Sequence, residues 1–383
     1  MKLKVFFLSF ICSILFLTGC VKNNNKMETI KFSTWGSSSE MAILKPIISD
    51  FEKQNPNIKI DLVHIPQDYF QKIHLLFASN LAPDVVFINN LNLPIYTSRL
   101  EPLNYNKNIY YKESIDALSY KGKTYAVPRD VSNLVIYYNK DLFDKYNVPY
   151  PKTNWTMEDL LSTAKNLTSK NTFGIGYEED IYYALPYIMS FGGGILGNDL
   201  KTELINTKQS QTGLTFYKNL ANKYHVAPQK YQVGSKTIAQ MFLNQEIAMH
   251  LSGRWMTPKY RESAKFNWDV AAFPGVGVGV NERKGIVPTD ASGWAVSRDS
   301  KHKADAIKFV MFLSSKSNIE KMTKSGLIVP ARIDVSNSPI FLNGKPQSSH
   351  VFTDEIKYSK PTPISTNYNR ILDNLNDRLF LSK

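Results

Sequence analysis

The sequence has very few cysteines: Cys12 and Cys20, both within the first 20 residues. The rest of the chain therefore has no disulfide, no cysteine-based metal site and no thiol nucleophile. Beyond residue 20, no apolar run approaches the roughly 18 residues that a membrane-spanning helix needs. The six histidines include no pair four residues apart, and neither H-E-x-x-H nor G-x-S-x-G occurs. With no recognisable pair of catalytic carboxylates either, the sequence predicts no enzyme, no metal and no cofactor.

The chain also lacks clustered charge. Lys and Arg number 46 against 33 Asp and Glu, a formal net charge of +13, but no basic run reaches five residues. Scattered lysines are typical of a solvated surface, so no nucleic-acid partner is expected, although an anionic lipid or substrate stays open. With 383 residues, 43% hydrophobic and 21% charged, the chain is long enough for about two lobes.

The first residues read as a leader. Lys2 and Lys4 precede an apolar run from Val5 to Leu17, which is too short for an anchor. The following Thr18-Gly19-Cys20 resembles the bacterial lipobox, whose cysteine receives a lipid. This predicts a signal peptide over 1–19, lipidation of Cys20, a polar tether over 20–27, and an extracytoplasmic domain anchored to a membrane. An ordinary signal peptide with a chance cysteine is the alternative.

Residues 29–65 predict a strand, a polar turn, a helix and a second strand. The serine run from Ser37 and the following Glu40 have the spacing of a capping box. Pro46 implies that the helix kinks or begins late. The turn also carries Trp35, and in an open α/β sheet such a turn lies at the carboxyl end of its strand, where ligands bind. A capped surface helix with a half-buried Trp remains the alternative interpretation.

Several ordered motifs resemble one family, the extracellular solute-binding proteins of sugar-type ABC transporters, which include maltose-binding and glycerol-3-phosphate-binding proteins. These motifs are W-x-x-S-x-E from Trp35, N-K-D-L-F near 139–143, a W-T-M-E-D-L helix start at 155–160, G-R-W at 253–255, S-G-W-A-V-S at 292–297, and G-L-I-V-P-A-R at 326–332. The match spans about residues 29–335. An Asn inserted before Trp155 and the sequence Asn244-Gln245-Glu246 depart from the family pattern.

The resemblance implies an α/β periplasmic-binding-protein fold of type II. Each lobe would be a mostly parallel sheet flanked by helices, and a multi-strand hinge would join them. The N-terminal lobe is expected over 28–129 and 281–335, and the C-terminal lobe over 130–280 and 336–383. A monomer would close on one small molecule and dock on the permease of an ABC importer.

Ligand-binding candidates combine aromatic plates with polar side chains near predicted strand ends and cleft crossings. They are Trp35, Ser37, Ser38, Glu40, Tyr69, Asn90, Asp130, Tyr182, Gly193, Arg254, Trp255, Trp294, Arg332 and Arg370. Alternatives stay open for four of them: a plain turn for Asn90, an interlobe ion pair for Asp130 and for Arg332, and a core position for Trp255. Trp155 is interpreted as structural.

The expected ligand is a sugar or oligosaccharide, whose ring offers apolar faces and many hydroxyls. A glycerol phosphate or glycerophosphodiester is an alternative ligand that the positive net charge of the chain would suit. A secreted polysaccharide hydrolase or lyase also stays open, as does an iron- or polyamine-binding relative.

Overall fold

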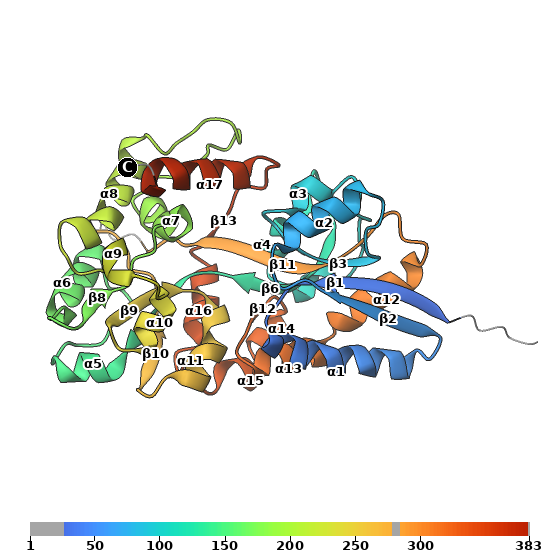
Figure 1. The fold of residues 1–383 in the computed structure, drawn as a ribbon, viewed down its shortest axis with the longest axis horizontal. Helices are drawn as coiled ribbons and strands as arrows, with labels where there is room; N and C mark the ends of the chain where they lie inside the picture. Colours follow the sequence, from blue (N-terminus) through green and yellow to red (C-terminus); the bar gives the residue numbers. More distant parts are fainter. Residues whose placement is uncertain (1–26, 278–283, 382–383) are drawn as a thin grey trace, which may run out of the picture.

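The protein is described by a computed structural model over residues 27–277 and 284–381. These residues form two α/β lobes that lie side by side (Figure 1). The predicted leader, tether and lipidated Cys20 lie outside the described residues, as does part of the glycine- and valine-rich loop after residue 274. In the described part, no helix is both long and apolar enough to cross a membrane.

The first lobe contains the N-terminal elements and a later return of the chain. Its N-terminal elements are β1 (Glu28–Thr34), α1 (Ser38–Gln54), β2 (Ile58–His64), α2 (Tyr69–Ala78), β3 (Val85–Asn89), α3 (Leu93–Tyr96), η1 (Lys107–Ile109), α4 (Lys112–Ala117), β4 (Ser119–Tyr120), β5 (Lys123–Thr124) and β6 (Ala126–Ser132). The returning elements are β11 (Pro288–Val296), α12 (Lys303–Leu313), α13 (Lys316–Lys324), β12 (Val329–Pro330) and α14 (Ile333–Ser336).

The second lobe is built mainly from the middle of the chain. Its elements are β7 (Val135–Asn139), α5 (Lys140–Lys145), α6 (Met157–Leu167), β8 (Phe173–Ile175), α7 (Ile181–Ser190), α8 (Lys208–Asn222), α9 (Lys230–Val233), α10 (Ile238–Leu243), β9 (Ile247–Ser252), η2 (Arg254–Met256), α11 (Thr257–Ser263) and β10 (Trp268–Ala271). The C-terminal segment contributes to both lobes through α15 (Pro339–Leu342), α16 (His350–Ile356), β13 (Lys360–Pro361), α17 (Tyr368–Asn376) and a π-helical turn, η4 (Asp377–Leu381). Of these, α15 contacts α13 and α14, and β13 pairs with β11, all elements of the first lobe. Because η4 follows α17 directly, the α-helix continues into the π-helical turn without a break.

The opening strand–helix–strand unit forms as the sequence predicts. The Ser37 hydroxyl accepts the Glu40 N–H at 3.3 Å, and the Glu40 carboxylate accepts the Ser37 N–H at 2.9 Å. Both bonds satisfy donors that the helix itself leaves unpaired. The helix begins directly after this box and runs through Pro46, so the expectation of a late start is wrong.

The first sheet has the order β12-β6-β11-β3-β1-β2, with β13 beside β11. β1 pairs in parallel with β2 and β3, whereas β11 runs antiparallel to β3 and β6. Arg129 and Asp130, the residues on either side of the predicted lobe boundary, lie within β6. The predicted lobe boundary between 129 and 130 therefore falls inside a strand of the first sheet.

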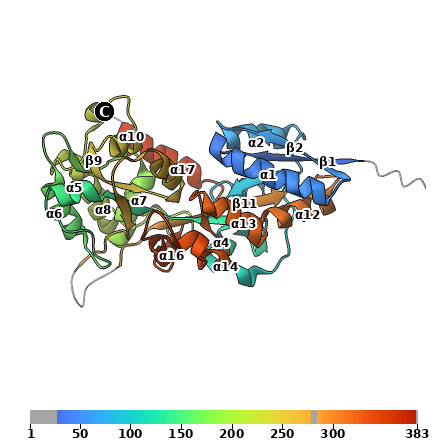
Figure 2. The same ribbon diagram turned by 90° about the horizontal axis from the view of Figure 1, so that it is seen from below.

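The second sheet is more mixed than the expected parallel arrangement. Its order is β10-β7-β9-β8, and only β8 and β9 pair in parallel. The chain enters along β7 directly from β6 and leaves from β10 toward β11. β7 leads into the second lobe and β10 leads back out of it, so these two neighbouring strands are antiparallel. β7 is also antiparallel to β9, its neighbour on the other side. These connections place the sheet ends of the two lobes against each other (Figures 1 and 2).

Three of the five tryptophans pack in the interior. Trp294, Trp268 and Trp155 are almost wholly buried, and the Trp155 indole N–H donates to the Ala272 carbonyl at 2.8 Å. The structural interpretation of Trp155 is thus confirmed. Trp35 and Trp255 are the two tryptophans that remain well exposed.

Candidate functional site

Strand ends place the candidate residues at one edge of each sheet. In the first sheet, the parallel strands β1 and β3 end at Thr34 and Asn89, directly before Trp35 and Asn90. In the second sheet, the parallel strands β8 and β9 are followed by residues 176–180 and by Gly253. Carboxyl ends of parallel strands share an edge, which is where open α/β sheets bind ligands.

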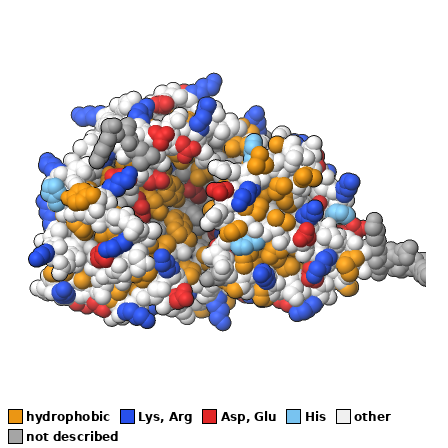
Figure 3. Space-filling model, viewed as in Figure 1, with side chains coloured by type: hydrophobic (Ala, Val, Ile, Leu, Met, Phe, Trp, Pro, Cys, Tyr) orange, Lys and Arg blue, Asp and Glu red, His pale blue; other side chains and the backbone are white. Residues whose placement is uncertain are grey.

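The two edges face each other across the molecule. The Asn369 amide, in the first turn of α17, donates to the Leu91 carbonyl at 3.3 Å. The Tyr182 hydroxyl on α7 donates to Asp290 Oδ2 on β11 at 3.4 Å. Figure 3 shows a hollow between the lobes, bordered by hydrophobic and acidic side chains. We call this hollow the interlobe cleft.

Trp35 forms an aromatic plate on the first lobe. Its side chain is 40% exposed. Behind it, the Phe87 ring stacks at a centroid distance of 5.5 Å and an interplanar angle of 28°, and the rings of Tyr69 and Phe70 lie 6.5 and 6.0 Å away. Because three rings support the indole from behind, its exposed face is held in a fixed orientation.

Trp255 is the corresponding plate on the second lobe. It lies in η2, directly after β9, and is 37% exposed. A Cβ atom on Gly253 would lie 1.9 Å from the Trp255 ring, so the indole rests on the glycine backbone. Because Gly253 has no Cβ atom, the Trp255 ring can occupy this position. Trp255 is exposed, so the alternative that it lies in the core is wrong.

A cation on the first lobe is fixed by two carboxylates. Arg129 Nη2 lies 2.6 Å from Asp130 Oδ2, and Nη1 lies 3.6 Å from Glu40 Oε1. Its guanidinium also lies 4.8 Å from the centre of the Phe87 ring. Asp130 Oδ1 in turn accepts the Ser292 hydroxyl at 2.7 Å. Asp130 is thus paired within the first lobe, and the interlobe ion pair considered for it is not found among the described residues.

Asp290 organises the joint between the lobes. Its carboxylate accepts the Asn90 amide at 2.9 Å, the Thr362 hydroxyl at 2.5 Å and the Tyr182 hydroxyl at 3.4 Å. Burial raises the pKa of Asp290, and these three bonds oppose the rise. Asn90 is itself wholly buried, with its oxygen accepting the Ala291 N–H at 3.1 Å. Asn90 lies in a turn, as its alternative interpretation held, and its side chain is buried at the joint.

The second lobe adds further acidic groups near the start of α7. Glu178, Glu179 and Asp180 follow β8. Burial, followed by the charge of Asp180, raises the pKa of Glu178. Glu179 lies 3.5 Å from the ammonium of Lys230. This part of the second lobe is therefore predominantly acidic, although the whole chain is basic.

Two predicted aromatic contacts lie instead in the interior. Tyr69 is almost fully buried, and its hydroxyl donates to the Phe87 carbonyl at 3.0 Å. Trp294 is 1% exposed. Both lie on strands or helices whose inner face fills the core, and Tyr69 acts only from behind Trp35.

Two predicted arginine contacts also have other roles. Arg254 is 2% exposed and lies between the rings of Phe341 and Phe352, at 4.2 and 5.1 Å from their centres. Arg332 pairs with Asp334 two residues away, at 2.8 Å, so the interlobe ion pair expected for it is not found among the described residues. Arg370, by contrast, is exposed in the first turn of α17.

The remaining candidates are backbone positions or caps. Ser37 is the helix cap described above, and Ser38 is exposed in the first turn of α1. A Cβ on Gly193 would lie 2.5 Å from Ser210 Oγ, so this glycine permits close packing of α7 against α8. Sequence reasoning did not propose Arg129, Glu178 or Asp290 as site residues. A charged residue within a buried strand that is otherwise uncharged, as at Asp290 in β11, is the signal that could have found it.

Two α/β lobes that face each other across a hollow, each with an exposed indole near the end of a strand, are typical of a binding protein of the periplasmic type. In the described part, no group of three or more His, Cys, Asp or Glu side chains could hold a metal ion.

Residues 35–320 match the family described as "Bacterial extracellular solute-binding protein". The chain therefore belongs to this family. The predicted family and the two-lobed fold are confirmed. So is the prediction that the chain is not an enzyme, because the proteins of this family bind solutes without converting them.

Relatives and solved structures agree with this assignment. The chain is 23% identical to the galactooligosaccharide-binding protein of Bacillus subtilis (strain 168), over 88% of this chain and 80% of that one. It is 25% identical to the multiple sugar-binding protein of Streptococcus mutans, over 88% and 84%. An ABC substrate-binding protein of Listeria monocytogenes in complex with cycloalternan superimposes with a TM-score of 0.83 and 27% identity, covering 91% of this chain and 92% of that one. UgpB of Mycobacterium tuberculosis in complex with glycerophosphocholine shares the fold, with a TM-score of 0.77 and 18% identity, covering 91% and 90%.

Proposed function

We propose that this protein binds an oligosaccharide in the interlobe cleft and delivers it to the permease of an ABC importer. The observation that carries the proposal is the pair of exposed indoles, Trp35 and Trp255, at the facing edges of the two sheets. A sugar ring has apolar C–H faces that stack on indoles, and its hydroxyls can bond to nearby carboxylates and amides. The relatives named for galactooligosaccharides and multiple sugars support the same ligand class.

The charges of the cleft favour an uncharged sugar over a glycerol phosphate. Two of the candidate arginines are not available to a phosphate, because Arg254 is buried and Arg332 is paired with Asp334. Arg129 is already paired with two carboxylates. A phosphate would therefore meet the acidic groups near Glu178 with little compensating positive charge.

Hinge closure is the mechanism that we propose for capture. The lobes meet at contacts such as those of Asp290 with Tyr182 and of Leu91 with Asn369, while the indoles stay exposed on either side. A ligand that touches both walls binds the closed form better and shifts the open–closed equilibrium toward it. The two lobes would follow the predicted division, with the first boundary moved to the end of β6.

The cellular setting is part of the same proposal. Cleavage before Cys20 and its lipidation would tether a monomer to a membrane surface, beside its permease. Replacement of Cys20 by alanine is expected to release the protein from the membrane fraction, and retention of the variant there would contradict the lipid anchor.

Thermal unfolding with a ligand panel tests the ligand class. The panel contains raffinose, stachyose, maltotriose, glycerol 3-phosphate and glycerophosphocholine. A ligand at about 100 times its dissociation constant stabilises the folded state by roughly 2.7 kcal/mol and raises the midpoint. At least one oligosaccharide is expected to do so. A midpoint raised only by the glycerophosphates, or recovery of a cleaved sugar by chromatography, would overturn the proposal.

A further inference from the structure

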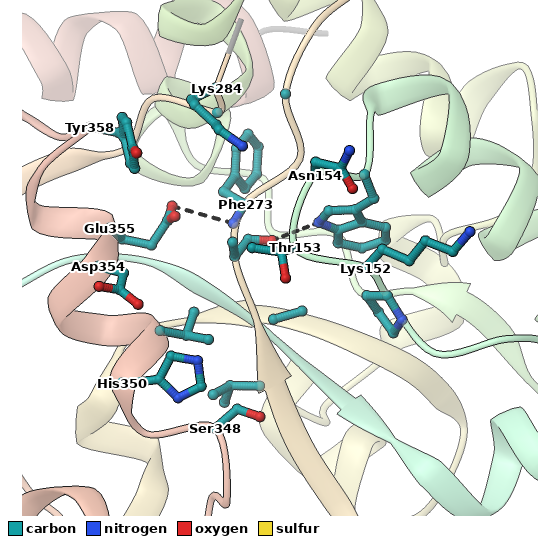
Figure 4. A pocket seen from close by; sticks show the side chains of 18 of the residues that line it. Lys152, Thr153, Asn154, Phe273, Lys284, Ser348, His350, Asp354, Glu355 and Tyr358 are labelled. Carbon is teal, nitrogen blue, oxygen red and sulfur yellow. Dashed lines mark hydrogen bonds between the residues drawn. The ribbon is translucent and has the colours of Figure 1, made fainter. Parts of the chain in front are cut away.

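The protein has a second concavity, on the side of the molecule away from the interlobe cleft. It has a volume of about 380 Å³ and is bordered by α16, by the loop over 151–155 and by the chain from β10 to Gly275 (Figure 4). In Figure 2, α16 lies on the lower side of the molecule, whereas α1 and α17 lie on the upper side. We call this space the rear cavity. It shares no residue with the cleft candidates, so a ligand site in it would be independent of the proposed function.

A buried carboxyl group faces this cavity. Glu355 on α16 is 5% exposed, and its Oε2 accepts the Phe273 N–H across the cavity at 3.4 Å (Figure 4). Burial, with a smaller contribution from the charge of Asp354, raises the pKa of Glu355 to about 8, against the hydrogen bond from Phe273 and the positive charge of Lys284. One long hydrogen bond does not compensate the removal of a carboxylate from water. The group is therefore held largely uncharged at neutral pH.

The neighbouring acid behaves differently. Asp354 also borders the cavity, but it lies at the surface and pairs with Lys357 at 3.0 Å. Its charge is thus already matched by a cation and by water. Of these two adjacent acids, only Glu355 still gains free energy by acquiring a charged hydrogen-bond donor.

Aromatic surfaces stand around this carboxyl group. Trp155, Phe273, Tyr138 and Tyr358 all border the cavity. Trp155 is held in place by its bond to the Ala272 carbonyl. Aromatic faces attract cations and also provide apolar contact for hydrocarbon. The combination of a buried acid and several rings suits a ligand with an ammonium group on an apolar body.

We propose that the rear cavity binds a small organic ammonium ion, with its N–H donors on Glu355 and its apolar part against Trp155 and Phe273. The volume falls in the range of small-molecule pockets, roughly 300–1,000 Å³. The other charged or titratable groups at the cavity are Lys152, Lys284, His350, Asp354, Lys357, Tyr138 and Tyr358. The three lysines are exposed at the mouth, whereas the buried end of the cavity carries the acid.

Binding is coupled to a proton. A protonated amine favours the carboxylate form of Glu355, so the Glu355 proton passes to solvent as the ion pair forms. The ligand keeps its own proton and no covalent bond changes. Close to one proton is therefore released per ligand at about pH 7, and fewer above about pH 8.

Three compounds with the same ring test the charge requirement: benzylammonium, benzyl alcohol and benzoate. Ligand-observed NMR and calorimetry on the purified protein are expected to give benzylammonium at least a tenfold higher affinity than the alcohol, and no binding of benzoate. Calorimetry in two buffers of different ionisation enthalpy measures the proton released. Comparable affinity for the alcohol, preference for benzoate, or absence of proton release would overturn the proposal.

Two variants locate the site. Glu355→Gln keeps the shape of the side chain and is expected to reduce benzylammonium affinity at least tenfold and to abolish proton release. Asp354→Asn, on the same helix, is the matched control and is expected to change affinity less than about threefold. Far-UV circular dichroism checks that both variants are folded. Unchanged binding by Glu355→Gln, or an equal loss in Asp354→Asn, would contradict the assignment of the ammonium to Glu355.

Discussion

The interlobe cleft and the rear cavity both combine aromatic rings with buried acids, but they satisfy those acids differently. In the cleft, Asp290 accepts three side-chain hydrogen bonds and Asp130 accepts a hydroxyl and a guanidinium. In the rear cavity, Glu355 accepts one hydrogen bond at 3.4 Å. Satisfied carboxylates fix the geometry of the joint between the lobes. An unsatisfied one costs stability and leaves a position for a ligand.

The largest expected effect of any substitution is that of Glu355→Gln on the pH dependence of the free energy of unfolding. Glu355 has a folded-state pKa of about 8, against an ordinary value near 4.3 when unfolded. Between those values the folded state binds the extra proton, so its stability falls as pH rises. Glu355→Gln removes this titration. Its free energy of unfolding should exceed that of the unsubstituted protein by an amount on the order of 2–5 kcal/mol at about pH 9, and by little near pH 4.

Urea unfolding at several pH values measures this difference. Asp354→Asn serves as the exposed control and should show no comparable pH-dependent gain. A difference between Glu355→Gln and the unsubstituted protein that stays constant with pH would show that Glu355 is not held uncharged.

The second-largest effect is expected on the affinity of the interlobe cleft for sugar. Trp35→Ala removes an indole that three rings hold in place. Loss of a well-supported aromatic anchor typically costs about 2 kcal/mol, or roughly thirtyfold in affinity. Titration with the oligosaccharide that binds best measures the change. Trp35→Phe should recover part of the affinity, and benzylammonium binding should be unaffected. Equal sugar affinity in Trp35→Ala would remove Trp35 from the site.

A smaller effect is expected from Gly253→Ala. The added methyl would occupy the position of the Trp255 ring, so the indole must move away from its present place. We expect sugar affinity to fall by about 1 kcal/mol, or roughly fivefold. Tryptophan fluorescence and titration together check it. A shifted Trp255 emission with full sugar affinity would mean that the second indole does not contact the ligand.

The smallest effect is expected from Tyr182→Phe. This change removes the longest of the three side-chain bonds to Asp290 and leaves the other two. A net loss of about 0.5 kcal/mol in stability is expected, since the acid remains satisfied. Thermal unfolding measures it. A loss as large as the gain in Glu355→Gln would mean that the contrast between the two acids is wrong.

Local patterns predicted much of the fold. The capping box at Ser37, the alternation in β1 and β2, and the apolar run of β7 each specify their structure through neighbouring residues. The register of β11 between β3 and β6 depends on residues more than 150 positions apart in every pair, such as Ser292 with Asp130. No local period encodes such pairing, which is why the predicted lobe boundary between Arg129 and Asp130 fell inside β6.

The candidate site was predictable where side chains follow strand ends, as at Trp35 and Trp255. It was not predictable where burial decides the role. Arg254 adjoins an exposed indole in the sequence, yet its own side chain lies in the interior. An exposed arginine and a buried one have the same residue type and charge, so the local sequence does not distinguish the two roles. The burial of Arg254 follows from its packing against α15 and α16.

The position of Arg254 has a mechanical consequence. Its guanidinium lies between one ring from α15 and another from α16, and its Nη1 donates to Ser349 Oγ at 3.3 Å. Trp255 is the next residue along the chain, and α16 carries Glu355. Through Arg254, the backbone next to the exposed Trp255 indole is therefore held directly against α16, the helix that borders the rear cavity.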